Sequence, residues 1–137
     1  MAITLSFVSN LPDPSAFQAL MREYYQVMID KVIAIGGPAL SADELAADTM
    51  AHLDDLLPPK GRTLLATVDN GTLVGCGVIR KIRPDAAELK RMYVRPSAQG
   101  SGLGRRLFEM RIAEARRMGC TNLYADTVKG NRAMLSM

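Results

Sequence analysis

The stretch Gln99-Gly100-Ser101-Gly102-Leu103-Gly104 determines the interpretation of this sequence, because glycine occupies alternate positions in it. It follows an apolar, strand-like stretch at 87–95 and precedes a helical pattern at 103–118. Glycine has no Cβ and tolerates positive φ angles, so neighbouring backbone N–H groups can converge on one point. That point lies at a helix N-terminus, where unpaired amides and the helix dipole favour an anion. The sequence therefore predicts a phosphate cradle between a strand and a helix.

The alternative interpretation of this loop is a tight strand-to-helix turn that merely needs glycine. Two better-known phosphate loops are excluded. The dinucleotide pattern G-x-G-x-x-G fails because, counted from Gly100 or Gly102, its last position falls on Arg105 or Leu107. The Walker loop fails because the chain contains no Gly-Lys-Ser or Gly-Lys-Thr.

Local signals on both sides of the loop predict the remaining elements. Asp13-Pro14 is typical of an N-cap followed by proline at the first helical position, and Ser41 with Glu44 forms a capping box. Asp69-Asn70-Gly71 predicts a hairpin turn. The expected elements are a strand at 2–8, helices at 14–35 and from Ser41 to Pro58, strands at 63–68, 72–82 and 87–95, a helix at 103–118, a strand at 122–127 and a helix opening near Asn131. In the helix at 103–118 we expect Leu103, Leu107, Met110 and Ala115 to face inward and the arginines to face outward.

The order β-α-α-β-β-β-α-β-α predicts one α/β (α+β) domain over residues 1–137, with a mixed, mostly antiparallel sheet and helices on both faces. No apolar run approaches the ~20 residues that a membrane-spanning helix needs, and the N-terminus does not resemble a signal peptide. Cys76 and Cys120 are far apart and lack metal-ligand spacing, so we expect two buried, reduced thiols in a cytoplasmic protein without a bound metal.

Charge is distributed unevenly along the chain. Residues 1–79 carry four basic and nine acidic side chains, whereas residues 80–117 carry eleven basic and four acidic ones. Such asymmetry is typical of a protein with one side facing a polyanion, although a solvated surface can have the same composition. A nucleic-acid-binding protein is the weaker interpretation, because the chain has no tryptophan and few aromatic residues on which bases could stack.

Residues 87–96, Ala-Glu-Leu-Lys-Arg-Met-Tyr-Val-Arg-Pro, followed by Gln99-x-x-Gly102-x-Gly104, resemble the acetyl-CoA signature of the GNAT superfamily of N-acetyltransferases. That signature reads Arg or Gln, two residues, Gly, one residue, then Gly or Ala. The resemblance covers about residues 62–135 and implies a GNAT-like fold. It also implies transfer of an acetyl group from acetyl-CoA to a primary amine of a small molecule or peptide, by direct attack in a ternary complex. A non-catalytic or truncated acyl-CoA-binding domain is the alternative.

The resemblance also implies roles for individual residues. The backbone of Met92, Tyr93 and Val94 would pair with the pantetheine arm, and an N–H of that stretch would stabilise the developing oxyanion. Asn131 would contact the pantetheine end. The backbone amides expected to bind the pyrophosphate are those of Gln99, Gly100, Ser101, Gly102, Leu103, Gly104 and Arg105.

Direct attack needs a base to accept the amine proton, and Glu88, eleven residues before Gln99, is the best candidate. The alternative is that Glu88 forms an ion pair with Lys90 or with an arginine on the next strand. His52 is unique but is more typical of a structural histidine. Cys76 is a poor nucleophile candidate because nothing near it in sequence lowers its pKa.

The acceptor side is less defined by the sequence. Glu44, Asp48 and Asp55 share roughly one helical face, which could attract a cationic amine or could simply face solvent. Tyr24 and Tyr25 are candidates for lining an acceptor pocket, with at least one of them expected in the core.

The C-terminal end departs from the family pattern. The resemblance implies two further strands and a tyrosine, as acid for the thiolate, seven residues after Asn131, which is just beyond Met137. We therefore expect the C-terminal part of the family fold to be absent and the last parallel strand to have an open edge. Such an edge favours pairing with a second copy of the chain, so a homodimer is one expectation.

Overall fold

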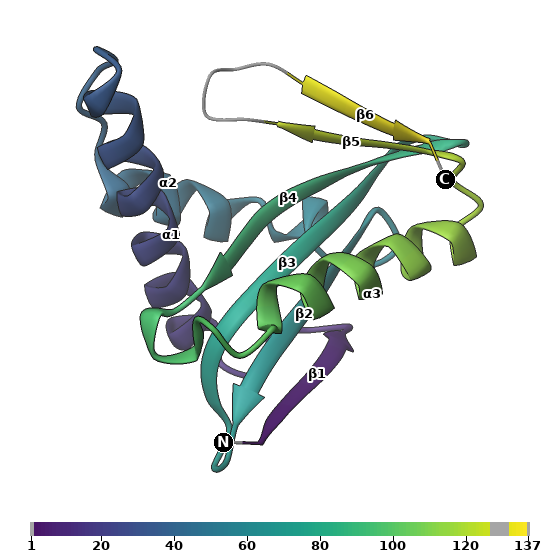
Figure 1. The fold of residues 1–137 in the computed structure, drawn as a ribbon, viewed down its shortest axis with the longest axis horizontal. Coiled ribbons are helices and arrows are strands. Elements are labelled where there is room, and N and C mark those ends of the chain that lie inside the picture. Colours follow the sequence, from purple (N-terminus) through teal and green to yellow (C-terminus); the bar gives the residue numbers. More distant parts are fainter. Residues whose placement is uncertain (1, 127–131, 137) are drawn as a thin grey trace.

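The computed structural model describes residues 2–126 and 132–136. Figure 1 shows one sheet flanked by helices. The elements are β1 (Ile3–Val8), α1 (Pro14–Ala34), α2 (Ala42–Ala51), β2 (Gly61–Val68), β3 (Thr72–Arg83), β4 (Ala86–Val94), α3 (Leu103–Arg117), β5 (Asn122–Asp126) and β6 (Arg132–Ser136), with 3-10 turns at Leu53–Asp55 and Pro96–Ala98. The six strands lie in the order β1-β2-β3-β4-β5-β6. All neighbours are antiparallel except β4 and β5, which are parallel.

The helix ends form where the sequence places capping residues. The Asp13 side chain accepts a hydrogen bond from the Ala16 amide at 3.1 Å, and the Ser41 hydroxyl accepts one from the Glu44 amide at 3.2 Å. Each satisfies an amide that the first helical turn leaves without a partner. At the other end of α3, Gly119 adopts a φ of +84°, as a C′ glycine does. The predicted N-caps at Asp13 and Ser41 and the C′ glycine at Gly119 are confirmed.

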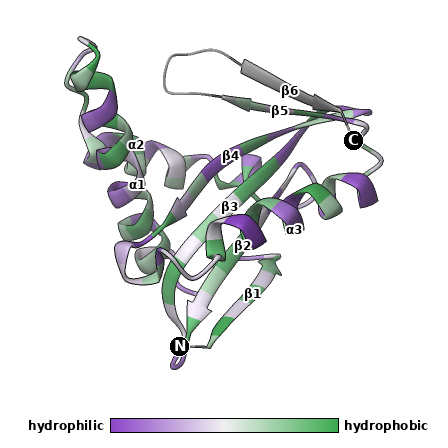
Figure 2. Cartoon of the chain, in the orientation of Figure 1, coloured by the Kyte–Doolittle hydropathy of each residue, from purple (hydrophilic) through white to green (hydrophobic). Residues whose placement is uncertain are grey.

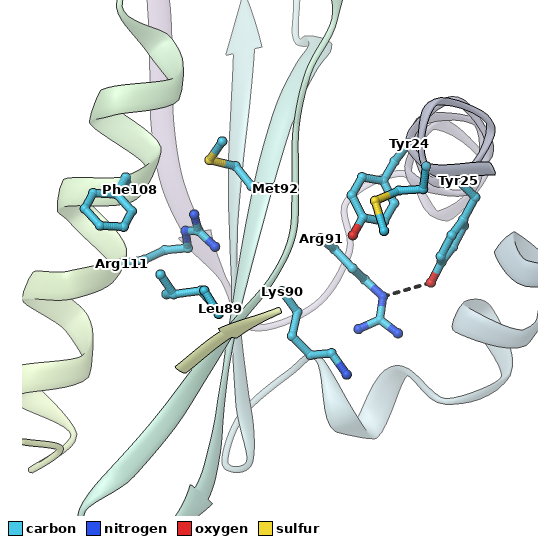
Figure 3. A pocket seen from close by; sticks show the side chains of 10 residues that line it. Tyr24, Tyr25, Leu89, Lys90, Arg91, Met92, Phe108 and Arg111 are labelled. Carbon is cyan, nitrogen blue, oxygen red and sulfur yellow. Dashed lines mark hydrogen bonds between the residues drawn. The ribbon is translucent and has the colours of Figure 1, made fainter. Parts of the chain in front are cut away.

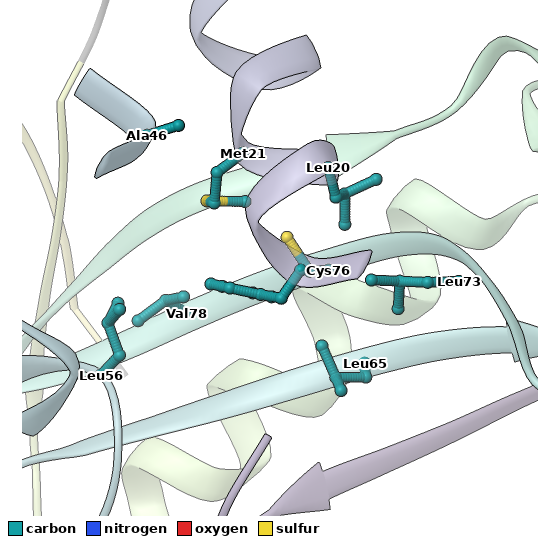
Figure 4. Packing of buried hydrophobic residues seen from close by; sticks show 9 residues of the cluster. Leu20, Met21, Ala46, Leu56, Leu65, Leu73, Cys76 and Val78 are labelled. Atoms are coloured by element: carbon teal, nitrogen blue, oxygen red, sulfur yellow. The ribbon is translucent and has the colours of Figure 1, made fainter. Parts of the chain in front are cut away.

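Helices cover both faces of the sheet, as predicted (Figure 1). Alternate strand residues point to opposite faces, so Leu65 packs with α1 whereas Leu64 packs with α3. Figure 4 shows Leu20 and Met21 of α1 packed over Cys76 and neighbouring strand residues. Figure 2 shows hydrophilic and hydrophobic residues alternating along α1 and α3. Within the described residues, no helix is both long and apolar enough to cross a bilayer.

Two expectations about the C-terminal region are wrong. Where the sequence predicted a helix from Asn131, the structure has strand β6, which pairs with β5 through five residue pairs. β6 therefore covers the edge of β5 that was expected to be open. The physical reason is that the edge of β5 offers a row of unpaired backbone groups with which residues 132–136 can form hydrogen bonds.

Two smaller expectations also need correction. The second helix ends at Ala51, and a 3-10 turn carries the chain on to Leu56, so its buried side chains are Ala42, Ala46 and Thr49. In α3, Arg111 faces inward and is 2% exposed, although we expected every arginine of this helix to face outward.

Two irregularities of β4 position the site. β4 and β5 pair only from Ala86 to Leu89, and beyond this point Figure 1 shows the two strands spreading apart. On the other side of β4, the pairing with β3 shifts between Lys90 and Tyr93, and Arg91 adopts a φ of +51°. Such a bulge inserts one extra residue and redirects the strand. The sheet therefore opens into a gap between β4 and β5.

Candidate functional site

The glycine loop connects β4 to α3 in the geometry of an anion cradle. Gly100 and Gly102 adopt φ angles of +81° and +80°, and Gly102 is the N-cap of α3. The first intrahelical hydrogen bond runs from the Arg106 amide to the Gly102 carbonyl at 3.2 Å, so the amides just before Arg106 point out of the helix end without an intrahelical acceptor. An added Cβ at Gly100, Gly102 or Gly104 would meet no protein atom within 4 Å. This open side can admit a phosphate-sized group.

Side chains of the loop turn back toward the protein and hold it in place. The Gln99 side-chain amide donates to the Val94 carbonyl at 3.2 Å, and the Ser101 hydroxyl donates to the Ala98 carbonyl. Leu103 is buried in the core between α3 and the sheet. The Arg105 side chain forms an exposed ion pair with Glu109 at 2.9 Å, so it is directed along α3 and not over the loop. The loop is therefore anchored while its backbone stays accessible.

A pocket of about 500 Å³ lies where β4 and β5 spread apart. Figure 3 shows Phe108, Arg111 and Met92 on the α3 side of this pocket, and Tyr24, Tyr25, Lys90 and Arg91 on the α1 side. Its ten lining residues come from α1, β4, β5 and α3 and are Tyr24, Tyr25, Met28, Leu89, Lys90, Arg91, Met92, Phe108, Arg111 and Ala125.

The bulge at Arg91 is held by three side chains from other elements. The Cys76 thiol donates to the Arg91 carbonyl at 3.2 Å, and the Tyr24 hydroxyl contacts the Arg91 backbone. The Arg91 Nε donates to the Tyr25 hydroxyl at 3.1 Å. These contacts compensate for a positive φ, which is uncommon for a residue other than glycine.

Burial sets the protonation state of two of these groups. Complete burial raises the pKa of the Cys76 thiol to about 12, so it is a protonated donor and not a nucleophile at neutral pH. Burial also raises the pKa of Tyr24, with a smaller contribution from the neighbouring Tyr25. The expectation that Cys76 is a poor nucleophile agrees with this environment.

Arg111 is a buried cation that the sequence did not reveal. Its Nε donates to the Leu107 carbonyl at 3.1 Å and its Nη1 to the Val78 carbonyl at 3.2 Å. Gly77 makes room for it, because a Cβ there would lie 2.7 Å from the Arg111 Nε. Within the described residues, no carboxylate lies within 4 Å of Arg111, and burial lowers the pKa of its guanidinium to about 10. An uncompensated positive charge therefore borders the pocket.

Glu88 is 2% exposed and lies next to the pocket lining without being part of it. Its Oε1 lies 2.8 Å from the Arg80 Nη2 and 3.6 Å from the Lys90 Nζ. The ion pairs that the sequence left as an alternative are present in the structure. Lys90 connects Glu88 to the pocket, because its side chain lies beside the Glu88 carboxylate and also lines the pocket.

The side chains of the other predicted site residues point to different parts of the structure. Met92 is exposed at the pocket, whereas the Tyr93 hydroxyl donates to the Glu23 carboxylate at 3.3 Å on the α1 side. Val94 packs partly buried near α3. Asn131 lies outside the described residues.

The polar residues considered on the second helix do not line the pocket. His52 is exposed beyond the end of α2, and its ring contacts the Asp48 carbonyl, which raises the pKa of the imidazole. Glu44 and Asp48 face solvent, and Asp55 pairs with Lys60 at 2.7 Å. Both tyrosines considered for an acceptor pocket, Tyr24 and Tyr25, do line it.

Sequence reasoning missed Lys90, Arg91, Phe108 and Arg111. The sequence did contain two adjacent cations, Lys90 and Arg91, in a predicted strand. In a regular strand only one of them would point toward a given face, so at most one would be expected at a site on that face. A bulge lets both reach the pocket, but nothing in the local sequence marks an arginine as a residue of positive φ. No comparable signal distinguished Arg111 from the exposed arginines of α3.

Comparisons with known proteins agree with this geometry. The sequence model described as "Acetyltransferase (GNAT) family" matches residues 17–137. An uncharacterised N-acetyltransferase of Schizosaccharomyces pombe is 28% identical over 127 residues, covering 92% of this chain and 73% of that protein. The IAA acetyltransferase of Azospirillum brasilense is 42% identical over 79 residues, covering 57% of this chain and 51% of that protein, about half its length.

A solved structure shares the fold. The PaiA N-acetyltransferase of Thermoplasma acidophilum, in complex with coenzyme A, superposes with a TM-score of 0.69 at 17% sequence identity. The match covers 93% of this chain and 80% of that one. The predicted mixed, mostly antiparallel sheet with helices on both faces is thus confirmed.

Proposed function

The chain belongs to the acetyltransferase (GNAT) family, and from this premise we propose that it moves an acetyl group from acetyl-CoA to a primary amine by direct attack. The observation that carries the proposal is the continuous path from the exposed glycine loop, along β4, to the pocket where β4 and β5 spread apart. The PaiA relative was solved with coenzyme A, which supports an acyl-CoA as the cosubstrate.

The residues along this path fit the parts of acetyl-CoA. We assign the pyrophosphate to the amides from Gln99 to Arg105, because the open side of the loop admits a phosphate. The stretch 92–94 has no β5 partner among the described residues, so its outward backbone groups can pair with the pantetheine amides as a strand would. Three residues of strand span ~10 Å, which leads from the cradle toward the pocket. Asn131 stays a proposed contact of the pantetheine end.

Acetyl-CoA supplies an activated thioester, and the chain must manage the charges that develop as the amine attacks it. A backbone N–H at the bulge can donate to the oxygen that becomes negative. Arg111 borders the α3 side of the pocket, where its positive charge would stabilise the departing thiolate. We propose Glu88 as the group that receives the amine proton, through water, beside Lys90.

A Glu88→Gln substitution separates this role from that of an ion-pair partner. If Glu88 accepts the proton, the variant should lose at least about tenfold in kcat. If Glu88 only neutralises Arg80 and Lys90, the variant should unfold at lower temperature and keep its kcat. Steady-state rates, together with thermal unfolding, decide between the two roles.

Binding of the cosubstrate can be tested without knowledge of the acceptor. We expect acetyl-CoA to bind in a calorimetric titration, and adenosine to bind at least about 100-fold more weakly, because it cannot form the charge-assisted hydrogen bonds of the pyrophosphate. Equal affinity for the two would contradict the cradle. Thiol release against a panel of amines then tests turnover. Acetyl-CoA binding without release for any amine would favour the alternative of a non-catalytic acyl-CoA-binding protein.

We also infer a cytoplasmic location, the absence of a nucleic-acid partner, and a homodimer. With β6 at the edge of the sheet, a homodimer would pair through β6 or β1 or through another surface.

A further inference from the structure

The pocket carries positive charge without matching negative charge. Among its ten lining residues, Lys90, Arg91 and Arg111 are cationic, and none has a carboxylate. Glu88 partly compensates Lys90 at 3.6 Å. In the part of the chain that the structure describes, neither Arg91 nor Arg111 has a carboxylate within 4 Å. Charges in such a setting favour a ligand of opposite sign.

Arg91 is held in one orientation by a directed chain of hydrogen bonds. The Thr49 hydroxyl donates to the Leu45 carbonyl at 3.1 Å, so its hydrogen is committed. The Tyr25 hydroxyl, 2.7 Å away, must therefore donate to Thr49, which leaves its oxygen to accept from the Arg91 Nε at 3.1 Å. One edge of the guanidinium is thus fixed against α1.

The opposite part of the Arg91 guanidinium stays available to a ligand. Its two terminal nitrogens form no hydrogen bond or ion pair with the described residues, and Figure 3 shows the group lying beside Tyr25 and Lys90 on the α1 side of the pocket. A pre-oriented guanidinium fork matches the geometry of a carboxylate and loses little entropy on binding it.

The path proposed for acetyl-CoA gives Arg91 no phosphate to bind. The pyrophosphate is assigned to residues 99–105, and Arg91 is separated from that loop by the stretch 92–94, ~10 Å of strand. Arg91 also lies on the α1 side, across the pocket from α3, on which the cradle is built (Figure 3). The remaining ligand on this side is the acceptor.

We propose that the acceptor is an amine that also carries a carboxylate, which the Arg91 fork binds while the apolar body of the acceptor packs against Tyr24, Tyr25 and Met28. An amino acid with an apolar or aromatic side chain is the simplest compound of this class. The inference rests on the proposed function. It replaces the idea of a purely cationic amine drawn in by the acidic residues of α2, because Glu44 and Asp48 face solvent outside the pocket.

A matched pair of acceptors tests the inference on the unaltered protein. Phenylalanine and phenylalaninamide share one body and one attacking amine, and only the first has a carboxylate. The amino group of phenylalaninamide is less basic than that of phenylalanine, so a larger fraction of it is unprotonated and able to attack. This difference favours the amide and therefore works against the preference that we expect. We expect kcat/KM for phenylalanine to exceed that for the amide by at least about tenfold, the loss that one charged hydrogen-bond partner causes. Equal rates would overturn the inference.

Variants locate the preference at Arg91. Arg91→Gln should raise KM for phenylalanine by at least about tenfold, abolish the preference over the amide, and leave KM for acetyl-CoA unchanged. Arg91→Lys should restore part of the preference. The exposed Arg83, paired with Asp85 outside the pocket, supplies the control Arg83→Gln, which should change neither constant. An Arg91→Gln effect on KM for acetyl-CoA alone would overturn the inference by assigning Arg91 to the cosubstrate.

The remaining outcomes separate this inference from the proposed function. Release of thiol with amines in general, but no preference for a carboxylate, would contradict the acceptor class alone. A preference for O-phosphoethanolamine over every carboxylate-bearing amine would also overturn it. If none of the amines leads to thiol release, the proposed function is contradicted. In that case phenylalanine and phenylalaninamide would each be titrated into the protein saturated with coenzyme A. Tighter binding of phenylalanine than of its amide would support the inference, and equal binding would overturn it.

Discussion

Replacing Gly102 with valine is expected to weaken acetyl-CoA binding by about 100-fold or more. Gly102 adopts a φ of +80° at the N-cap of α3, a conformation that a β-branched residue adopts only under strain of ~1–3 kcal/mol. The loop would relax by rotating this peptide, which turns away amides proposed to hold the pyrophosphate. The new side chain would also project into the space on the open side of the loop. Calorimetric titration with acetyl-CoA measures the loss.

A control substitution distinguishes loss of the cradle from general damage. Gly119→Val imposes the same strain at a φ of +84° on the opposite end of α3, so it should lower the unfolding temperature but preserve acetyl-CoA affinity. Unchanged acetyl-CoA affinity in Gly102→Val would contradict the assignment of the loop.

The Arg111→Met variant is expected to be more stable than the unaltered protein and slower in turnover. Burial lowers the pKa of Arg111 to about 10, and a lowering of this size corresponds to ~3 kcal/mol of cost for the charged form. Methionine fills similar space without that cost, although two hydrogen bonds to carbonyls are lost. We expect the free energy of unfolding to rise by ~1–3 kcal/mol, as when buried charges give way to apolar side chains.

The sign of this effect can be checked against pH. Because the pKa of Arg111 is lower in the folded protein than in the unfolded chain, the cost is fully present below about pH 10. The stability difference between variant and unaltered protein should therefore be constant from pH 5 to 9. Denaturant unfolding at three pH values measures it, and the exposed Arg106→Met is the control, with less than ~0.5 kcal/mol of change.

Turnover should fall in the same variant. Without the Arg111 charge beside the departing thiolate, kcat should drop by about tenfold or more while KM for acetyl-CoA changes little. A stable variant with undiminished kcat would remove Arg111 from the mechanism. A destabilised variant would show that its hydrogen bonds to Leu107 and Val78 outweigh the cost of burying its charge.

Much of the fold could be predicted because its signals are local. Asp13, Ser41 and Gly119 end helices through contacts with residues three or four positions away, and these ends form as predicted. The alternation of Leu64 and Leu65 between the two faces follows from strand geometry alone. The last element could not be predicted in this way, because β6 depends on an available edge of β5, which no local pattern announces.

In the candidate site, too, some features follow from consecutive residues and others depend on residues distant in the sequence. Consecutive residues specify the glycine loop, since positive φ angles at Gly100 and Gly102 and a helix start at Leu103 are requirements of the backbone itself. The interpretation of Glu88 stayed open because a carboxylate on a strand can be a base or an ion-pair partner. The structure adds that Arg80 and Lys90 stand beside it, and this sharpens the experiment that decides its role.

The sequence by itself thus determined the glycine loop, the order of elements up to β5 and the family signature, because each is encoded in residues close together along the chain. Only the tertiary structure decided the charge of the pocket. Arg91 is oriented by Tyr25, 66 residues away, and Arg111 is buried against Val78, 33 residues away. The same side chains would be ordinary solvated cations on an exposed strand or helix. What they do here depends on which distant segments remove water from around them, and that is a property of packing.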